Sequence, residues 1–409
     1  MADPTTSPPL TRTSVIEAHE LIKPFIHHTP TLTNATLDKL ASTPSPGTGT
    51  GTGTANPKIR LYFKCENLQR IGAFKIRGAF HAIERLKMDP GWDRGVVVTH
   101  SSGNHAQALA LAARTNDIPA YIVMPSISSP AKIAATQGYG AKVVFSGSTS
   151  VEREAVVERI MRETDGARLV PPYDHPDIIL GQGTLGLELQ RDASEIINSF
   201  SFSGGGGGGG DGGSSPVAEN IFRAPETIPK ERKEKGKGEK EKKKELDAIL
   251  APCGGGGMLS GVALSCEGTG IRVYGCEPSF QGADDAKRGY ESQGSLRVET
   301  VSTLTIADGL RTPVGRYPWS VIAPPRRLVR GFFSVTEEQI VAALRLILER
   351  FKMVVEPSAA VPLAVALFNE DFRTLVEKEG GEDGWDVGVV LSGGNVSLEA
   401  LGKLFAPKE

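Results

Sequence analysis

The sequence predicts an α/β protein, because apolar runs of strand length alternate with alanine-rich stretches of helical character. Tyr121–Met124 and Lys142–Phe145 are two such runs, and Ala106–Arg114 is one such helical stretch. Two further runs, Val96–Thr99 and Val387–Leu391, each lead into a short polar turn that contains glycine. These patterns are typical of buried parallel strands, and ligands of open α/β sheets bind at the carboxyl ends of such strands.

Length and composition favour an enzyme of the cytoplasm that acts on a small molecule. The 409 residues are 39% hydrophobic, which is enough for two or three domains with a large core. A net charge of −2 provides no general attraction to nucleic acid or to an anionic membrane. The four cysteines lack the density of a secreted scaffold and the paired spacing of a zinc site. We see no signal peptide and no transmembrane segment.

Residues 1–13 are polar and contain prolines, so we expect a flexible N-terminus, followed by a helix over Val15–Phe25.

Two stretches of low complexity interrupt the ordered pattern. Residues 42–57 contain a Gly-Thr repeat and are predicted to be a surface insertion. A longer insertion, from about 200 to 245, combines seven consecutive glycines with a Lys/Glu-rich tract. Its mixed charges favour a solvated spacer over a polybasic docking segment.

Lys75 and a distant run of four glycines, Gly254–Gly257, together indicate pyridoxal phosphate chemistry. A lysine amine can form a Schiff base with an aldehyde cofactor, and consecutive glycines let backbone N–H groups surround a phosphate. The glycines lie between the apolar run Ala248–Ala251 and a helix expected over Leu259–Cys266, so the phosphate would meet a helix N-terminus. Alone, the lysine would be a surface charge and the glycines a flexible loop.

Six motifs in order carry a resemblance to a known family. They are Phe74-Lys75-Ile76-Arg77-Gly78-Ala79, Ser101-Ser102-Gly103-Asn104-His105, Pro172-Tyr173-Asp174-His175-Pro176 with Gly181-Gln182-Gly183-Thr184, Gly254–Gly257, Ala307-Asp308-Gly309-Leu310-Arg311-Thr312 and Ser392-Gly393-Gly394-Asn395. Over most of its length the chain resembles a fold-type II pyridoxal phosphate enzyme of the serine/threonine dehydratase and serine racemase family. The resemblance implies a tryptophan synthase β-like fold, in which two open twisted sheets enclose the cofactor in a cleft.

The resemblance also implies domain boundaries. Residues 97–173 would form a small mobile substrate domain, and residues 14–96 and 174–409 would form the larger cofactor-binding domain. A homodimer is expected.

Roles for site residues follow from the matching motifs. Lys75 would form the Schiff base and then remove the Cα proton, and Ser102 would face it across the substrate. The predicted cofactor-binding residues are Phe74, Lys75, Asn104, Gly254, Gly255, Gly256, Gly257, Met258 and Ser392. The predicted substrate-binding residues are Ser101, Ser102, Gly103, Asn104, His105 and Arg153. His105 has a structural alternative as a hydrogen-bonded core histidine, and Arg153 has one as a charge on a helix surface.

Glu277, Ala283 and Asp285 resemble the family's loop for a divalent cation. Two carboxylates, a carbonyl oxygen and water suit Mg²⁺ or Ca²⁺, although the spacing here is longer than usual and an acidic surface loop is the alternative. Arg70 and Ile71 depart from the residues of serine racemase at its nucleotide site, so activation by ATP is not expected. The chain ends soon after Ser392, so feedback by isoleucine through a C-terminal regulatory domain is not expected either.

The predicted function is an ammonia-lyase that converts a 3-hydroxy amino acid to a 2-oxo acid and ammonia. L-serine, L-threonine and threo-3-hydroxyaspartate are the candidate substrates. Ser392 places a neutral hydroxyl beside the pyridine nitrogen, which disfavours long-lived carbanions and suits β-elimination. The alternatives are a serine racemase that uses Lys75 and Ser102 as opposed bases, a non-catalytic relative that acts through the charged insertion, and, less favoured, a β-replacement synthase.

Overall fold

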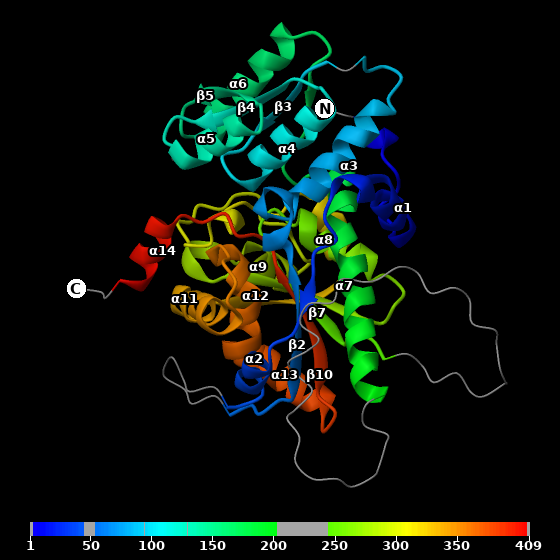
Figure 1. Ribbon diagram of the computed structural model, residues 1–409, viewed down its shortest axis with the longest axis vertical. Helices are drawn as coiled ribbons and strands as arrows, with labels where there is room; N and C mark the ends of the chain where they lie inside the picture. The colour runs from blue at the N-terminus through cyan, green and yellow to red at the C-terminus, as the bar shows by residue number, and fades with distance from the viewer. Residues whose placement is uncertain (1–2, 45–53, 94, 129, 203–243, 407–409) are drawn as a thin grey trace, which may run out of the picture.

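Two lobes, each built around one sheet, make up the computed structural model of this chain, which describes residues 3–44, 54–93, 95–128, 130–202 and 244–406 (Figure 1). The larger sheet has six strands in the order β1-β2-β10-β7-β8-β9. Its strands are β1 (Thr31–Leu32), β2 (Ile59–Cys65), β7 (Ala248–Pro252), β8 (Arg272–Pro278), β9 (Val329–Val335) and β10 (Trp385–Leu391). All neighbours are parallel except β1 and β2, and every residue of β7 and β10 is buried.

Helices cover both faces of this sheet, as buried parallel strands require. One face packs against α2 (Ala35–Ala41), α11 (Glu337–Leu346), α12 (Pro357–Phe368) and α13 (Glu370–Gly380). The other packs against α1 (Arg12–Ile22), α7 (Pro176–Phe202), α8 (Gly257–Ser265) and α10 (Arg316–Ile322). Figure 1 shows α7 and α8 on the opposite side of the sheet from α11 and α12. Two short helices, α9 (Asp285–Glu291) and α14 (Leu398–Phe405), add buried side chains to the second and the first of these cores, respectively.

The smaller sheet is parallel throughout and has the order β5-β4-β3-β6. Its strands are β3 (Val97–His100), β4 (Ala120–Pro125), β5 (Lys142–Ser146) and β6 (Arg168–Leu169). Core side chains of α4 (Asn104–Thr115), joined by α5 (Pro130–Gly138), pack on one face, and α6 (Ser150–Glu163) packs on the other. Helix α3 (Lys75–Lys87) contacts both α4 and α7, so it lies between the two lobes.

Short irregular helices complete the fold. The 3₁₀ segments are Pro4–Thr6, Lys23–Phe25, Glu66–Leu68, Arg70–Gly72, Phe280–Gly282 and Asp308–Leu310, and a π-helical turn spans Ile347–Phe351. Among the described residues, no helix combines the length and the apolar character needed to cross a membrane.

The predicted alternation of strands and helices is confirmed, with boundaries that shift by a few residues. The predicted helix over Val15–Phe25 is wrong at its end, because α1 stops at Ile22 and a 3₁₀ turn follows. Pro24 has no backbone N–H to continue an α-helix, which explains the change. Most of the two predicted insertions lies outside the described residues, at 45–53 and 203–243.

Candidate functional site

Lys75 lies between the two lobes, at the first residue of α3. The loop after β10 positions this segment, because Phe74 donates its backbone N–H to the carbonyl oxygen of Ser392 at 3.1 Å. The Lys75 Nζ donates to the carbonyl oxygen of Pro172 at 2.8 Å. Burial lowers the pKa of Lys75 to about 8, although the charge of Glu356 opposes this shift. The lowered pKa increases the fraction of neutral amine near neutral pH, which is the form that nucleophilic and basic chemistry requires.

The glycine loop, Gly254–Gly257, connects β7 to the N-terminus of α8, and all four glycines are buried. Gly256 has a φ of +80°, and a Cβ there would lie 2.9 Å from the Cβ of Pro318. A Cβ on Gly255 would lie 2.3 Å from the Cγ of Tyr173, so these positions exclude larger residues. Within the described parts of the chain, the backbone N–H groups of Gly254–Met258 find no acceptor. Buried donors without a partner are rare, and here they suit an anion such as a phosphate.

Asn104 and Ser392 come to the same region from different lobes. Asn104 is the first residue of α4, and Ser392 follows β10 and is 3% exposed. A hydroxyl both donates and accepts hydrogen bonds, so the Ser392 side chain suits a ligand nitrogen. The strand-end positions predicted for both loops are confirmed by the parallel pairing of β3 and β10 with their neighbours. Their cofactor contacts stay predictions.

Glu356 is a site residue that the motif analysis missed. It is 5% exposed and precedes Pro357 at the start of α12. Its two carboxylate oxygens accept from the Asn104 Nδ2 at 2.9 and 3.2 Å. Burial raises the pKa of Glu356 to about 7. The sequence offered one signal for this residue, because Glu356 is a single carboxylate between an apolar run and the apolar helix that begins at Pro357.

The serine loop follows β3, and its first hydroxyl is used locally, because Ser101 Oγ accepts from the backbone N–H of Gly103 at 3.3 Å. The His105 ring is 2% exposed, and its Nε2 donates to the carbonyl oxygen of Val170 at 3.1 Å. Burial lowers the pKa of His105 to about 3, so the ring is neutral. This geometry fits its structural alternative. The substrate contacts of the loop, Ser102 included, stay predictions.

Arg153 lies on α6 and donates from Nη1 to the carbonyl oxygen of Ser148 at 3.2 Å. Its charge helps to lower the pKa of His100, at the end of β3, where burial is the larger cause. The arginine is therefore within electrostatic range of the strand end that carries the serine loop. Its predicted approach to a substrate carboxylate stays a prediction.

The predicted cation ligands lie together at the end of β8 and the start of α9. The Glu277 carboxylate accepts from the backbone N–H groups of Ala286 and Lys287 at 3.0 and 2.8 Å. Asp285 Oδ2 accepts from the backbone N–H of Val314 at 3.2 Å. Burial raises the pKa of both carboxyl groups, that of Asp285 to about 6, and the charge of Asp285 adds to the shift of Glu277.

Both of these carboxylates thus already accept backbone hydrogen bonds. In the described part of the chain, no cluster of three or more His, Cys, Asp or Glu residues could hold a metal. The predicted set of Glu277, Asp285 and the Ala283 carbonyl contains only two such residues, so the absence of a larger cluster does not test it. The cation site stays a prediction.

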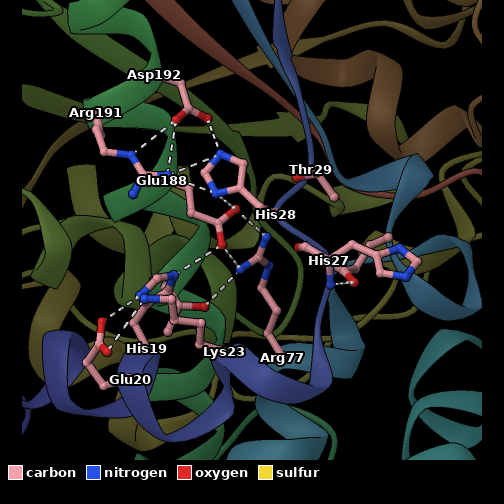
Figure 2. A network of polar contacts seen from close by, with 12 residues as sticks. His19, Glu20, Lys23, His27, His28, Thr29, Arg77, Glu188, Arg191 and Asp192 are labelled. Atoms are coloured by element: carbon pink, nitrogen blue, oxygen red, sulfur yellow. Dashed lines mark hydrogen bonds and ion pairs between the residues drawn. The ribbon is translucent and has the colours of Figure 1, made fainter. Parts of the chain in front are cut away.

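A buried network of charges supports the helix that starts at Lys75 (Figure 2). The Arg77 guanidinium, which is fully buried, donates to Glu66 at 2.7 and 2.8 Å and to Glu188 at 2.8 Å. Lys64 also pairs with Glu188, at 2.8 Å, and His19 contacts the same carboxylate at 3.2 Å. The network therefore ties α3 to β2, α1 and α7.

These features define a class of protein. A partly buried lysine of lowered pKa and a loop of unpaired N–H donors at a helix N-terminus meet where the two α/β lobes join. The residues present fit a cofactor that carries both an aldehyde and a phosphate.

Comparison with known proteins agrees with this class. Residues 44–230 and 219–393 match the family described as pyridoxal-phosphate dependent enzyme, and the chain belongs to that family. The serine racemase of Arabidopsis thaliana is 37% identical over 391 residues, covering 95% of this chain and 94% of that protein. The L-threo-3-hydroxyaspartate ammonia-lyase of Saccharomyces cerevisiae is 33% identical over 399 residues, covering 97% and 96%.

Solved structures show the same relationship. Maize serine racemase superposes with a TM-score of 0.72 at 32% identity, covering 96% of each chain. A threonine deaminase from T.th. has a TM-score of 0.67 at 32% identity, covering 97% of this chain and 99% of that one. The fold-type II architecture predicted from the sequence is confirmed.

Proposed function

We propose that this chain is a pyridoxal phosphate-dependent ammonia-lyase that converts a 3-hydroxy amino acid to a 2-oxo acid and ammonia. L-serine, L-threonine and threo-3-hydroxyaspartate are the proposed substrates. The observation that carries the proposal is the partly buried Lys75, with its lowered pKa, beside a glycine loop with unpaired N–H donors. Relatives named as an ammonia-lyase of threo-3-hydroxyaspartate and as threonine deaminase support the choice of substrate class.

When bound, pyridoxal phosphate makes the Cα–H bond of an amino acid acidic by withdrawing electrons from it. The N–H groups of Gly254–Met258 would hold the phosphate, and Lys75 would hold the aldehyde end. Once released, the Lys75 amine would take the Cα proton as a general base. The β-hydroxyl would then leave as water together with one proton, which balances the proton that Lys75 takes from Cα, and hydrolysis of the resulting enamine would yield the 2-oxo acid and ammonia. Ser392 would contribute an uncharged hydroxyl at the ring nitrogen.

A serine racemase is the second candidate, supported by relatives with that name and by Ser102 in the loop after β3. A racemase needs a proton donor on the face of the substrate opposite Lys75. The Ser102 hydroxyl is the group that would supply this proton. Elimination and racemisation share the first proton transfer, so one site can perform both reactions.

We also propose the wider organisation of the enzyme. Residues 97–173 would move as the substrate lobe against residues 14–96 and 174–409, in a homodimer located in the cytoplasm. Glu277, Asp285 and the Ala283 carbonyl would hold Mg²⁺ or Ca²⁺. Two buried carboxylates with raised pKa values are costly without a cation, which supports this site.

The test is release of 2-oxo acid by the purified, cofactor-loaded protein. L-serine, D-serine, L-threonine and threo-3-hydroxyaspartate are supplied separately, and the chirality of the residual substrate is determined in the same samples. We expect keto acid without inversion, and we expect the Lys75→Ala variant to abolish it. Inversion with little keto acid would favour the racemase, and keto acid release by Lys75→Ala would refute the assigned site.

A further inference from the structure

Glu356 connects the two lobes through Asn104. Its backbone N–H donates to the carbonyl oxygen of Gly393 at 3.0 Å, which fixes it beside the loop that follows β10. Its carboxylate accepts from the Asn104 Nδ2 at 2.9 Å, and Asn104 belongs to α4 on the smaller sheet. A buried carboxylate from the larger lobe thus contacts a predicted cofactor ligand of the smaller one.

The contacts on both ends of the Asn104 amide permit only one orientation. Asn395 Nδ2 donates to the Asn104 Oδ1 at 2.8 Å and also to the Ile71 carbonyl oxygen at 2.8 Å. The Ile71 carbonyl oxygen can only accept, so Asn395 must present its NH₂ group on this side. Asn104 therefore turns its oxygen toward Asn395 and its NH₂ group toward Glu356. The NH₂ nitrogen contacts both oxygens of the Glu356 carboxylate, at 2.9 and 3.2 Å, and a second hydrogen on it would be offered to a bound cofactor.

The charges that face Glu356 come from three further elements. Asp308, in the 3₁₀ segment Asp308–Leu310, raises the pKa of Glu356, and Lys132, on α5, lowers it. Lys75, on α3, is the third group, and the chain just before it passes close to Glu356. A Cβ built on Gly393 would lie 2.9 Å from the Glu356 Oε1 and 3.0 Å from the Cβ of Ala73, and the charge of Glu356 raises the pKa of Lys75. Lys132 and Asp308 also form an ion pair of 2.9 Å with each other across the lobes. The carboxylate is therefore electrostatically coupled to the lysine amine.

We propose that Glu356 is a positioning residue of the cofactor site, which fixes the Asn104 amide as a hydrogen-bond donor and controls the protonation of Lys75 by its charge. The inference rests on the proposed function, since it assumes that Asn104 and Lys75 bind the cofactor. It adds a residue outside the predicted motifs and does not depend on which amino acid is the substrate. Glu356→Gln removes only the charge, whereas Glu356→Ala also removes the hydrogen-bond acceptor, so the two variants separate the effect on Lys75 from the effect on Asn104.

The experiment measures cofactor binding without substrate. Glu356→Gln keeps an oxygen that can accept from Asn104 and removes the charge, so we expect near-normal cofactor affinity. The pH midpoint for reaction of the Lys75 amine with pyridoxal phosphate, followed by absorbance, should move down. Glu356→Ala also removes the acceptor, and we expect affinity to fall roughly tenfold, as for loss of one hydrogen bond to a charged group.

A double-mutant cycle tests whether Glu356 acts through Asn104. We expect Glu356→Ala combined with Asn104→Ala to bind the cofactor no more weakly than Asn104→Ala alone. Glu377→Gln is the matched control, because the Glu377 carboxylate accepts from the backbone N–H of Asn56 at 3.1 Å. Asn56 precedes β2, so this contact lies at the opposite end of the strands from the site. This control should leave affinity and midpoint unchanged.

Additive losses in the cycle, or an unshifted midpoint in folded Glu356→Gln, would overturn the inference. Circular dichroism shows whether each variant folds. If Glu356→Ala does not fold, the pH midpoint of Glu356→Gln still tests the inference. If the Glu356 variants change the absorbance midpoint and the cofactor affinity as predicted, but the unaltered protein releases no keto acid, only the proposed function is refuted. Normal keto acid release with an unshifted midpoint would refute only the role of Glu356.

Discussion

At the scale of single residues, burial makes Lys75 more acidic than an ordinary lysine. Its pKa of about 8 means that the reactive neutral amine increases as the pH rises through this value. We therefore expect apo-protein to take up pyridoxal phosphate slowly below pH 8 and at a constant, faster rate well above it. Stopped-flow absorbance measures the rate. A midpoint near the ordinary pKa of lysine would contradict the buried environment of Lys75.

Gly256 offers a second prediction at this scale, with Gly268 as its control. Both glycines have a φ of +80°, but a Cβ on Gly256 would meet Pro318 whereas a Cβ on Gly268 would meet open space. Gly268→Ala should cost only the backbone strain, about 1–2 kcal/mol in the free energy of unfolding. Gly256→Ala should cost more and also weaken cofactor binding. Denaturant unfolding and cofactor titration measure both, and equal effects would argue against a packed glycine loop.

At the scale of elements, the Arg77 network fixes α3, and with it Lys75, against its neighbours (Figure 2). Glu66 and Glu188 are buried and both depend on the Arg77 guanidinium, which holds the pKa of Glu188 below its usual range despite burial. Arg77→Met would leave both carboxylates without this partner. We expect the free energy of unfolding to fall by roughly 3–5 kcal/mol.

Denaturant unfolding checks this expectation. Lys403→Met is the control, because its ion pair with Glu399 lies on the exposed surface of α14 and should contribute nothing measurable. Equal stability of the two variants would mean that the network does not fix α3.

At the scale of the whole molecule, Lys244, the first described residue after the insertion over 203–243, lies beside the C-terminal half of α7, the helix that ends at Phe202. Lys244 donates its backbone N–H to the Asn198 side chain at 3.2 Å, and its carbonyl oxygen accepts from Asn198 Nδ2 at 3.0 Å and from Ser194 Oγ at 3.2 Å. Replacing residues 203–243 by a short glycine-serine linker should therefore preserve the melting temperature and keto acid release. Loss of a cellular association in this variant, with a normal phenotype for Lys75→Ala, would favour the non-catalytic alternative.

The sequence by itself determined the features that depend on local pattern. Apolar runs identified the strands, and the polar turns that follow them identified the loops after β3, β7 and β10, because parallel strands end at one edge of a sheet. Lys75 and Gly254–Gly257 were recognisable for the same reason, since each lies in a short motif with a defined chemistry. The resemblance to a known family assigned them roles.

Only the tertiary structure decided which distant groups meet and which are buried. Glu356 contacts Asn104 across 252 positions of the sequence, and Arg77 meets Glu188 across 111. No local periodicity encodes such contacts, because they depend on how helices pack on the sheets. The same packing buries Glu356 and His105, partly buries Lys75, and shifts the pKa values of all three. The chemical types in the site were thus readable from the sequence, whereas their protonation and their partners came from long-range packing.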